Sequence, residues 1–163
     1  MLEQRAPSFK SSIFDFYFES MNMRLFFLTL LLSFAAVGSA QALAGRWKTI
    51  DDETGRVKSI VEMTERNGLF FGEVVELFRL PEEDQDPHCV ECDDDRKDQR
   101  VLGMDIVRDM ETDEGEWNEG SICDPKNGKV YGCKMWFEEG EPNVLKVRGY
   151  WGFIYRTQEW MRQ

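Results

Sequence analysis

The stretch Ala42-Leu43-Ala44-Gly45-Arg46-Trp47 marks the point where an apolar leader ends and a strand-forming sequence begins. Upstream of it, Arg24 precedes an apolar run that extends to Val37 and is followed by small residues. This order of basic, apolar and small residues is typical of a secretory signal peptide. We therefore expect residues 23–40 to be a cleaved signal peptide, with an alternative end at residue 44.

The leader is too short to be interpreted as a membrane anchor. Its apolar run has about 15 residues, whereas a helix needs ~20 to cross a bilayer, so we expect no stable membrane span after cleavage. Residues 1–22 are an unusual lead-in because they contain acidic side chains. They are interpreted either as the result of a start codon assigned too far upstream or as a long leader.

After the leader, short apolar-rich segments alternate with turn signals at nearly regular intervals. Asn67-Gly68 and Asp124-Pro125-Lys126-Asn127-Gly128 are examples, since glycine supplies the positive φ that closes a hairpin. Apolar and charged residues alternate in segment 144–151, which is the two-residue period of a strand. The expected strands are 45–50, 56–65, 69–79, 99–108, 115–123, 129–137, 144–151 and 153–161.

These segments predict an all-β fold. Eight short strands joined mainly by hairpins form an antiparallel meander, and closing it into a barrel removes the exposed edges that promote aggregation. About 120 residues remain after the leader, which suits one domain with one core. We therefore expect residues 45–162 to form a single small up-and-down barrel.

The one long irregular segment, 81–98, carries a cluster of acidic side chains. The formal net charge is −11, and the leader contributes as many acidic as basic residues, so the mature domain keeps this charge. Such a surface disfavours phosphate backbones, and no nucleic-acid partner is expected. Because the cluster lacks the Asp-x-Asp-x-Asp-Gly pattern of a calcium loop, we interpret it as a solvated acidic loop.

The four cysteines, Cys89, Cys92, Cys123 and Cys133, would reach an oxidising compartment after export. We favour a disulfide between Cys89 and Cys92 as a local staple in the long loop. Cys123 and Cys133 are expected to be buried as small apolar residues.

The register of the hairpin around residues 125–128 stays open at this point. A four-residue turn would place Cys123 opposite Val130, with Cys133 on the other face of the sheet. A three-residue turn at 126–128 would place Cys123 opposite Tyr131 instead.

No motif predicts catalysis, a metal or a cofactor. The pair Cys89 and Cys92, next to His88, would indicate zinc only with a second matching pair, and a redox role would need a helix N-terminus beside the thiols. A Gly-x-Ser-x-Gly nucleophile motif and a glycine-rich phosphate loop are absent from the sequence. An enzyme acting through His88 or the cysteines is therefore the least favoured of the functions considered.

Gly45-Arg46-Trp47 resembles the Gly-x-Trp signature that opens lipocalin-like barrels. In that fold the tryptophan closes one end of the barrel and an arginine near the last strand packs over its ring. The resemblance implies this barrel-closing role for Trp47, with Arg156 or Arg162 as the arginine.

Five stretches spread over nearly the whole mature chain carry a closer resemblance. They are Gly45-Arg46-Trp47-Lys48-Thr49-Ile50-Asp51-Asp52-Glu53-Thr54-Gly55, Asp86-Pro87-His88-Cys89-Val90-Glu91-Cys92, Gly120-Ser121-Ile122-Cys123-Asp124-Pro125-Lys126-Asn127-Gly128-Lys129-Val130-Tyr131, Arg148-Gly149-Tyr150-Trp151-Gly152 and Arg156-Thr157-Gln158-Glu159-Trp160-Met161-Arg162. Together they resemble the bacterial exported proteins of the DUF2147 family. The resemblance implies a lipocalin-like barrel in the periplasm, and the biochemical role of the family is unknown. The chain departs from the family pattern at Cys123, where an aliphatic residue is expected.

The leading functional hypothesis is a non-catalytic module that binds a small, mostly apolar ligand, because a barrel of eight strands leaves an interior wide enough for one such molecule. Plain core packing is the alternative for the candidate lining or rim residues. A structural or protein-interaction module of the cell envelope, docking a protein partner through 81–98, is the alternative function. The candidate lining or rim residues are Phe71, Val75, Tyr131, Met135, Val147 and Trp151.

Overall fold

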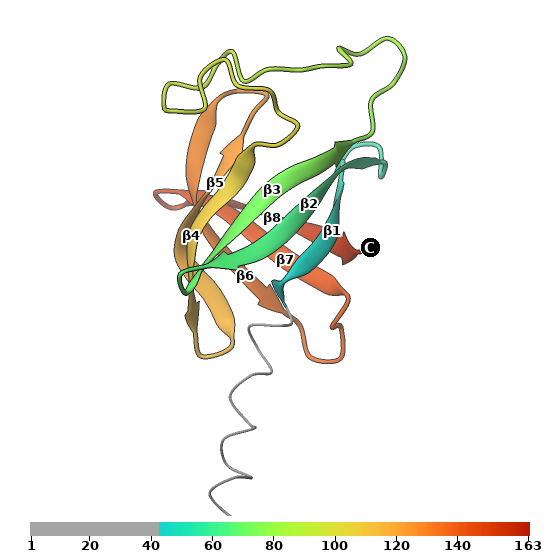
Figure 1. Ribbon diagram of the computed structural model, residues 1–163. Helices are drawn as coiled ribbons and strands as arrows, with labels where there is room; N and C mark the ends of the chain where they lie inside the picture. Colours follow the sequence, from blue (N-terminus) through green and yellow to red (C-terminus); the bar gives the residue numbers. More distant parts are fainter. Residues whose placement is uncertain (1–42) are drawn as a thin grey trace, which may run out of the picture. The chain divides into compact units, whose positions relative to one another are not determined.

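The computed structural model describes residues 43–163, in which eight antiparallel strands form one closed barrel in sequence order (Figure 1). This confirms the predicted all-β, up-and-down architecture. The predicted leader 1–22 and signal peptide 23–40 lie outside the described residues. Within the described part of the chain, no helix is both long and apolar enough to span a membrane. The strands are β1 (Gly45–Ile50), β2 (Val57–Arg66), β3 (Leu69–Leu77), β4 (Asp105–Asp113), β5 (Glu116–Asp124), β6 (Lys129–Phe137), β7 (Val144–Trp151) and β8 (Ile154–Arg162).

One predicted strand, 99–108, is wrong. Its first half belongs to the loop between β3 and β4, where Gly103 has a φ of 88° and donates its N–H to the carbonyl of Val74 at 2.8 Å. The strand then continues to Asp113, since the polar end of β4 pairs with β5 as the exposed part of a hairpin. The irregular segment is therefore longer than 81–98 and covers 78–104.

Aromatic rings fill the end of the barrel where β1 begins. Phe137 lies with its ring centroid 5.7 Å from those of both Trp47 and Trp117, and Phe70 packs edge-on against Trp117 at 6.1 Å. Trp47, Trp117 and Phe70 are fully buried. Rings of this size dominate the energetics of a small core, so this cluster anchors the fold.

Arg162 closes this end over Trp47. Its guanidinium carbon lies 4.2 Å from the centre of the Trp47 ring, and its Nη1 donates to the carbonyl of Ala44 at 3.4 Å. Gly45 adopts a φ of 122°, which glycine tolerates, and a Cβ there would lie 3.5 Å from the same guanidinium. Arg156 takes no part in the closure, because it pairs with Asp52 instead.

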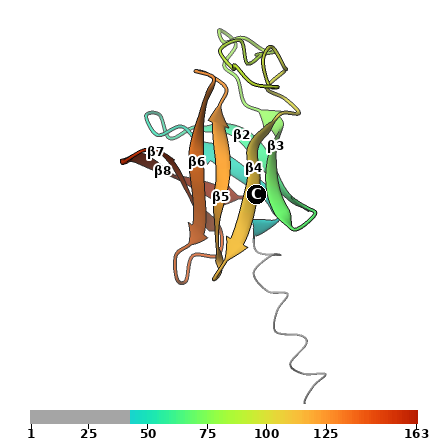
Figure 2. The same ribbon diagram turned by 90° about the vertical axis from the view of Figure 1, so that its left-hand side faces the viewer.

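The seam between β1 and β8 is paired only at this end. Its two pairs are Trp47 with Arg162 and Lys48 with Met161, whereas β7 and β8 pair along their whole length. Figure 2 shows the β7–β8 hairpin projecting sideways from the barrel wall. Large apolar side chains near its tip are consequently exposed, namely Trp151, Phe153, Ile154 and Tyr155.

Replacing Arg162 should destabilise the barrel more than replacing Arg156. We expect Arg162→Ala to lower the free energy of unfolding by about 1–2 kcal/mol, since a buried cation-π contact and a backbone hydrogen bond are lost. Arg156→Ala, at an exposed ion pair, should cost less than about 0.5 kcal/mol. Chemical denaturation of both variants checks this, and equal losses would contradict the assignment of the closing role to Arg162.

Candidate functional site

The long β3–β4 loop has a fixed conformation. The predicted disulfide between Cys89 and Cys92 is confirmed, with Cα atoms 5.4 Å apart. The N–H of Cys89 donates to the carbonyl of Gln99 at 2.8 Å, and the N–H of Asp98 donates to the carbonyl of Cys89 at 3.1 Å. These bonds join the two halves of the loop into a compact unit.

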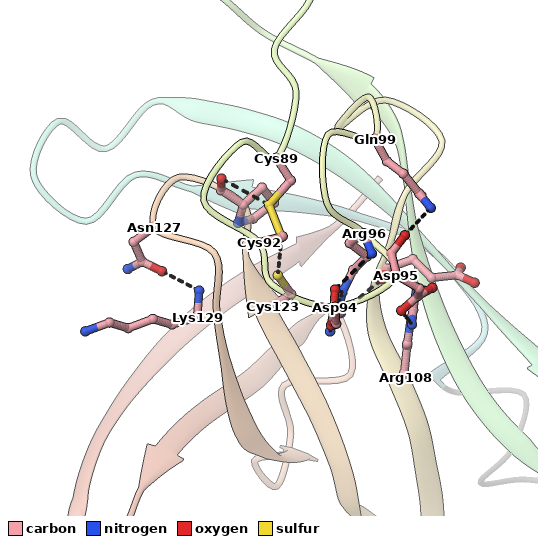
Figure 3. Close-up of polar contacts among 12 residues, drawn as sticks. Cys89, Cys92, Asp94, Asp95, Arg96, Gln99, Arg108, Cys123, Asn127 and Lys129 are labelled. Carbon is pink, nitrogen blue, oxygen red and sulfur yellow. Dashed lines mark hydrogen bonds and ion pairs between the residues drawn. A yellow bond between two sulfur atoms is a disulfide. The ribbon is translucent and has the colours of Figure 1, made fainter.

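Arginines pair with several carboxylates of the acidic cluster, while most of its side chains are exposed, as expected for a solvated acidic loop. Arg96, with only 3% of its side chain exposed, pairs with Asp94, and Arg108 on β4 forms a bidentate pair with Asp95 at 2.7 and 3.0 Å (Figure 3). The hydrogen bonds from Arg96 lower the pKa of Asp94 from its ordinary 3.8 to about 2. The acidic residues therefore attach the loop to itself and to the barrel.

The disulfide turn rests on the β5–β6 hairpin. Cys123 lies opposite Val130, so the four-residue turn is the correct alternative, and the Cys123 sulfur is 3.7 Å from that of Cys92. Gly128 has a φ of 69°, and a Cβ there would lie 1.9 Å from the carbonyl oxygen of Glu91. Only glycine permits so close a contact with the Glu91 carbonyl. The β5–β6 hairpin therefore packs against the loop at residue 128.

The two remaining thiols are buried. Burial raises the pKa of Cys133 to about 12, and burial also raises the pKa of Cys123. Because the thiolate is the nucleophile, neither cysteine is activated for attack. His88 is exposed and its Nδ1 lies 2.9 Å from the carbonyl oxygen of Asp86, so it stands outside the group of cysteines.

Methionine side chains fill much of the barrel interior. The sulfur of Met63 lies 2.7 Å from the position a Cβ on Gly72 would take, and that of Met110 lies 2.4 Å from the corresponding position on Gly120. Two glycines thus make room for two methionines inside the wall. A ligand in this part of the interior would have to displace packed side chains.

An open cleft of about 440 Å³ lies where the β1–β8 seam is unpaired. Asp52, in the β1–β2 turn, reaches across the gap to the guanidinium of Arg156 and accepts a hydrogen bond from Gln158 at 3.3 Å. These polar contacts stand where backbone pairs are missing, so side chains alone bridge this part of the seam. The lining residues are Ile50, Asp52, Thr157, Gln158, Glu159 and Met161.

Residues 45–162 match a family model described as an uncharacterised protein conserved in bacteria. The chain belongs to the DUF2147 family. Its fold is similar to that of a solved structure titled "Protein HP1028 from the human pathogen Helicobacter pylori belongs to the lipocalin family", with a TM-score of 0.60 and 19% identity over 74% of this chain and 82% of that one. At this identity the likeness shows the fold alone. No curated protein matched the sequence.

The predicted lining residues of this DUF2147 chain lie in different parts of the barrel. Met135 and Val147 are paired with each other and buried in the core. Tyr131 is partly buried on the same face, and its Cβ lies 3.5 Å from the Cβ position of Gly149. Trp151 is 69% exposed at the hairpin tip, where the Lys129 ammonium lies 5.5 Å from its ring centre.

Phe71 and Val75 do not line the interior as predicted. Phe70, Gly72 and Val74 are the buried residues of β3, so Phe71 faces outward, where Arg66 lies 4.9 Å from its ring centre. Val75 is the extra residue of a bulge, unpaired while Val74 pairs with Val61. The sequence pattern assigns the inward and outward faces of β3 one residue out of phase. It does so because apolar residues lie on both faces of this strand.

The sequence does not predict Asp52 and Gln158, which line the cleft, or Ile154 at the nearby hairpin tip. The cleft and this tip together are called the mouth of the barrel below. The apolar run from Tyr150 to Tyr155 was the available signal, since it interrupts the alternation and surrounds a turn at Gly152. The contact of Asp52 with β8 had no signal in the sequence, because 104 residues separate it from Arg156.

Removing the Asp94 carboxylate should destabilise the loop in a pH-dependent way. We expect Asp94→Asn to lower the free energy of unfolding by about 2 kcal/mol at neutral pH, since buried Arg96 loses its partner. The pKa of Asp94 is depressed in the folded state, so its contribution is present above pH ~4 and is lost as the pH falls towards ~2. Denaturation curves at both pH values should show a variant effect only at the higher one. Asp93→Asn, at an exposed neighbour, is the matched control.

A side chain at residue 128 should separate the loop from the hairpin. Gly128→Ala adds both backbone strain and a clash with Glu91, so we expect a loss of about 3 kcal/mol or more in unfolding free energy. Gly140→Ala is matched for positive φ, at 81°, and meets nothing within 4 Å. It should cost only about 1 kcal/mol, and an equal cost for both variants would contradict the close contact.

Proposed function

We propose that this protein is an exported, periplasmic binding module without catalytic activity, and that it binds a small, mostly apolar ligand at the open end of the barrel. The observation that carries this proposal is the unpaired part of the β1–β8 seam, beyond which the β7–β8 hairpin exposes apolar side chains at its tip, while methionines and aromatic rings occupy the core. The lipocalin-like fold supports the class of ligand. The proposed ligand site is at the mouth of the barrel, and the packed interior closes the site from below.

An apolar strip leads from the core to this mouth. Alternate residues of a strand share a face, so Gly149 and Trp151 continue the inward face of Val147 along β7. Ile154 lies opposite Trp151 on β8 and is also mostly exposed. Exposed aromatic and aliphatic side chains that continue from a core are typical of a ligand-binding surface.

The polar group of the ligand would meet Arg156. Arg156 lies opposite Gly149 on β8, and its side chain is 68% exposed apart from its pair with Asp52. A carboxylate or similar anion on the ligand could replace Asp52 as the partner of this guanidinium. We therefore favour an amphipathic ligand with an apolar body and an anionic end.

The contact that begins the barrel supports the earlier of the two expected cleavage sites. The indole N–H of Trp47 donates to the carbonyl of Leu43 at 2.8 Å, and Leu43 is fully buried. Signal cleavage after residue 40 keeps Leu43, whereas cleavage after residue 44 removes it. The earlier site is therefore the one we propose, and the Cys89–Cys92 disulfide fits an oxidising compartment.

Docking of a protein through 81–98 is the weaker alternative. Several of its carboxylates, among them Asp86, Asp94 and Asp95, already pair with arginines of the same chain. Such pairs leave less charge available for a partner.

Binding of an amphipathic probe should depend on the hairpin tip. We expect 8-anilinonaphthalene-1-sulfonate, which combines apolar rings with an anion, to gain fluorescence with the wild-type protein. Trp151→Ala should raise its Kd by roughly 10-fold or more, since truncation removes a central apolar contact. Phe71→Ala, on the outer face of β3, should leave the Kd unchanged. Loss in both variants, or in neither, would argue against a site at the mouth.

The two cleavage sites should give mature chains of different stability. A chain that begins at Gly45 leaves the buried Trp47 N–H without its acceptor, so its unfolding free energy should be lower by about 1–3 kcal/mol than that of a chain beginning at Gln41. A chain that begins at Ala42 retains Leu43 and should match the longer one. Equal stability for all three would remove the support that this contact gives to cleavage after residue 40.

A further inference from the structure

Three cysteine sulfurs from two distant parts of the chain meet beneath the β3–β4 loop. Cys89 and Cys92 come from the loop and Cys123 from the end of β5 (Figure 3). The three sulfurs all lie within 4.8 Å of one another, and each of the three residues is buried. Sequence spacing offered only the Cys-x2-Cys pair, and the fold supplies the third sulfur.

One edge of this sulfur triangle already has the length found between thiolates around one metal ion. A tetrahedral ion with metal–sulfur bonds of about 2.3 Å has sulfur–sulfur edges of about 3.8 Å. The separation of Cys92 and Cys123 is 3.7 Å. Once the disulfide is reduced, Cys89 and Cys92 need only move apart by a side-chain rotation to complete the other edges.

Transfer of the disulfide to Cys123 is the competing chemistry, and the geometry does not favour it. Exchange requires the attacking, central and leaving sulfurs to lie on one line. With a disulfide bond of about 2.05 Å and a contact of 3.7 Å, the outer sulfurs of such a line would be about 5.8 Å apart. Cys89 and Cys123 lie within 4.8 Å, so the three sulfurs form a triangle.

We propose that Cys89, Cys92 and Cys123 form a metal site in the reduced protein and bind one soft d10 cation, for which Zn²⁺ is the test ion. A phosphine or dithiol reductant donates two electrons to the Cys89–Cys92 bond, which breaks and takes up two protons to give two thiols, while the reductant becomes a phosphine oxide or a cyclic disulfide. Binding of the ion then forms three metal–sulfur bonds and releases three protons to solvent. Thiolate ligands select soft cations over Ca²⁺ and Mg²⁺, which prefer oxygen.

The parts of the chain that carry the cluster are held together, and charges of both signs surround it. Three thiolates with a dication leave one negative charge, and beside Cys123 the positive charges of Arg96 and Arg108 act against the negative charges of Asp94 and Asp124. Gly128 holds the hairpin against Glu91, the residue before Cys92, so the two parts of the site are already in contact before an ion binds. The site is separate from the ligand site proposed at the mouth, and either can fail without the other.

The test is zinc binding by the full chain, reduced with a phosphine under anaerobic conditions and titrated against a chromophoric zinc chelator. We expect one Zn²⁺ per reduced chain and none per oxidised chain. Replacing Zn²⁺ with Co²⁺ should give thiolate-to-cobalt charge-transfer bands. Cys123→Ala should raise the Kd for Zn²⁺ by roughly 100-fold or more, because one of three thiolates is lost.

Cys133→Ala is the matched control, since Cys133 is equally buried but lies outside the cluster. Its Kd for Zn²⁺ should equal that of the wild type. Circular dichroism of each reduced variant verifies that the barrel is intact, and alanine suits residue 123 because it removes only the sulfur atom. The proposal is overturned if the reduced wild type binds no Zn²⁺, or if folded Cys123→Ala binds it as tightly as the wild type.

Discussion

The contact between Arg162 and Trp47 is the constraint on which the rest of the barrel depends. Trp47 begins the first strand and Arg162 ends the last, so their stacking at 4.2 Å joins the two edges of the sheet. Directly beneath lie Phe137 and the other rings of the core. Because this end is held by rings and a guanidinium, the seam needs only two backbone pairs to close.

Because only two backbone pairs close the seam, the other end of the barrel is open. Beyond Lys48 and Met161 the first and last strands separate, and the β7–β8 hairpin, whose tip exposes apolar side chains, projects from the wall (Figure 2). The same architecture thus combines a half packed with aromatic rings and methionines with a half in which the seam is open.

Much of the fold was predictable from local signals. The bounds of β1, β6 and β7 follow directly from alternation and from turns rich in glycine and asparagine. The strand predicted at 99–108 failed because apolar residues next to Gly103 form a turn that packs under the loop, and only tertiary contacts decide this.

The candidate sites were less predictable from the sequence, because tertiary contacts form them. The phase of β3 was assigned wrongly because both of its faces are apolar, so Phe71 was placed inside. The pairing of Asp95 with Arg108 and the approach of Cys123 to Cys92 join residues that are 13 and 31 positions apart, and no sequence period encodes them. Recognition of the Cys89–Cys92 pair succeeded because it is local.

The most direct test of a ligand site at the mouth is an amide chemical-shift map of the protein titrated with a medium-chain alkyl carboxylate. The account predicts that shifts concentrate at residues 149–158 and at 49–52, on the two sides of the open seam, while the amides around Met63 and Met110 change little. Shifts concentrated around Met63, Met110 and Trp117 would place the ligand in the barrel interior and contradict the account.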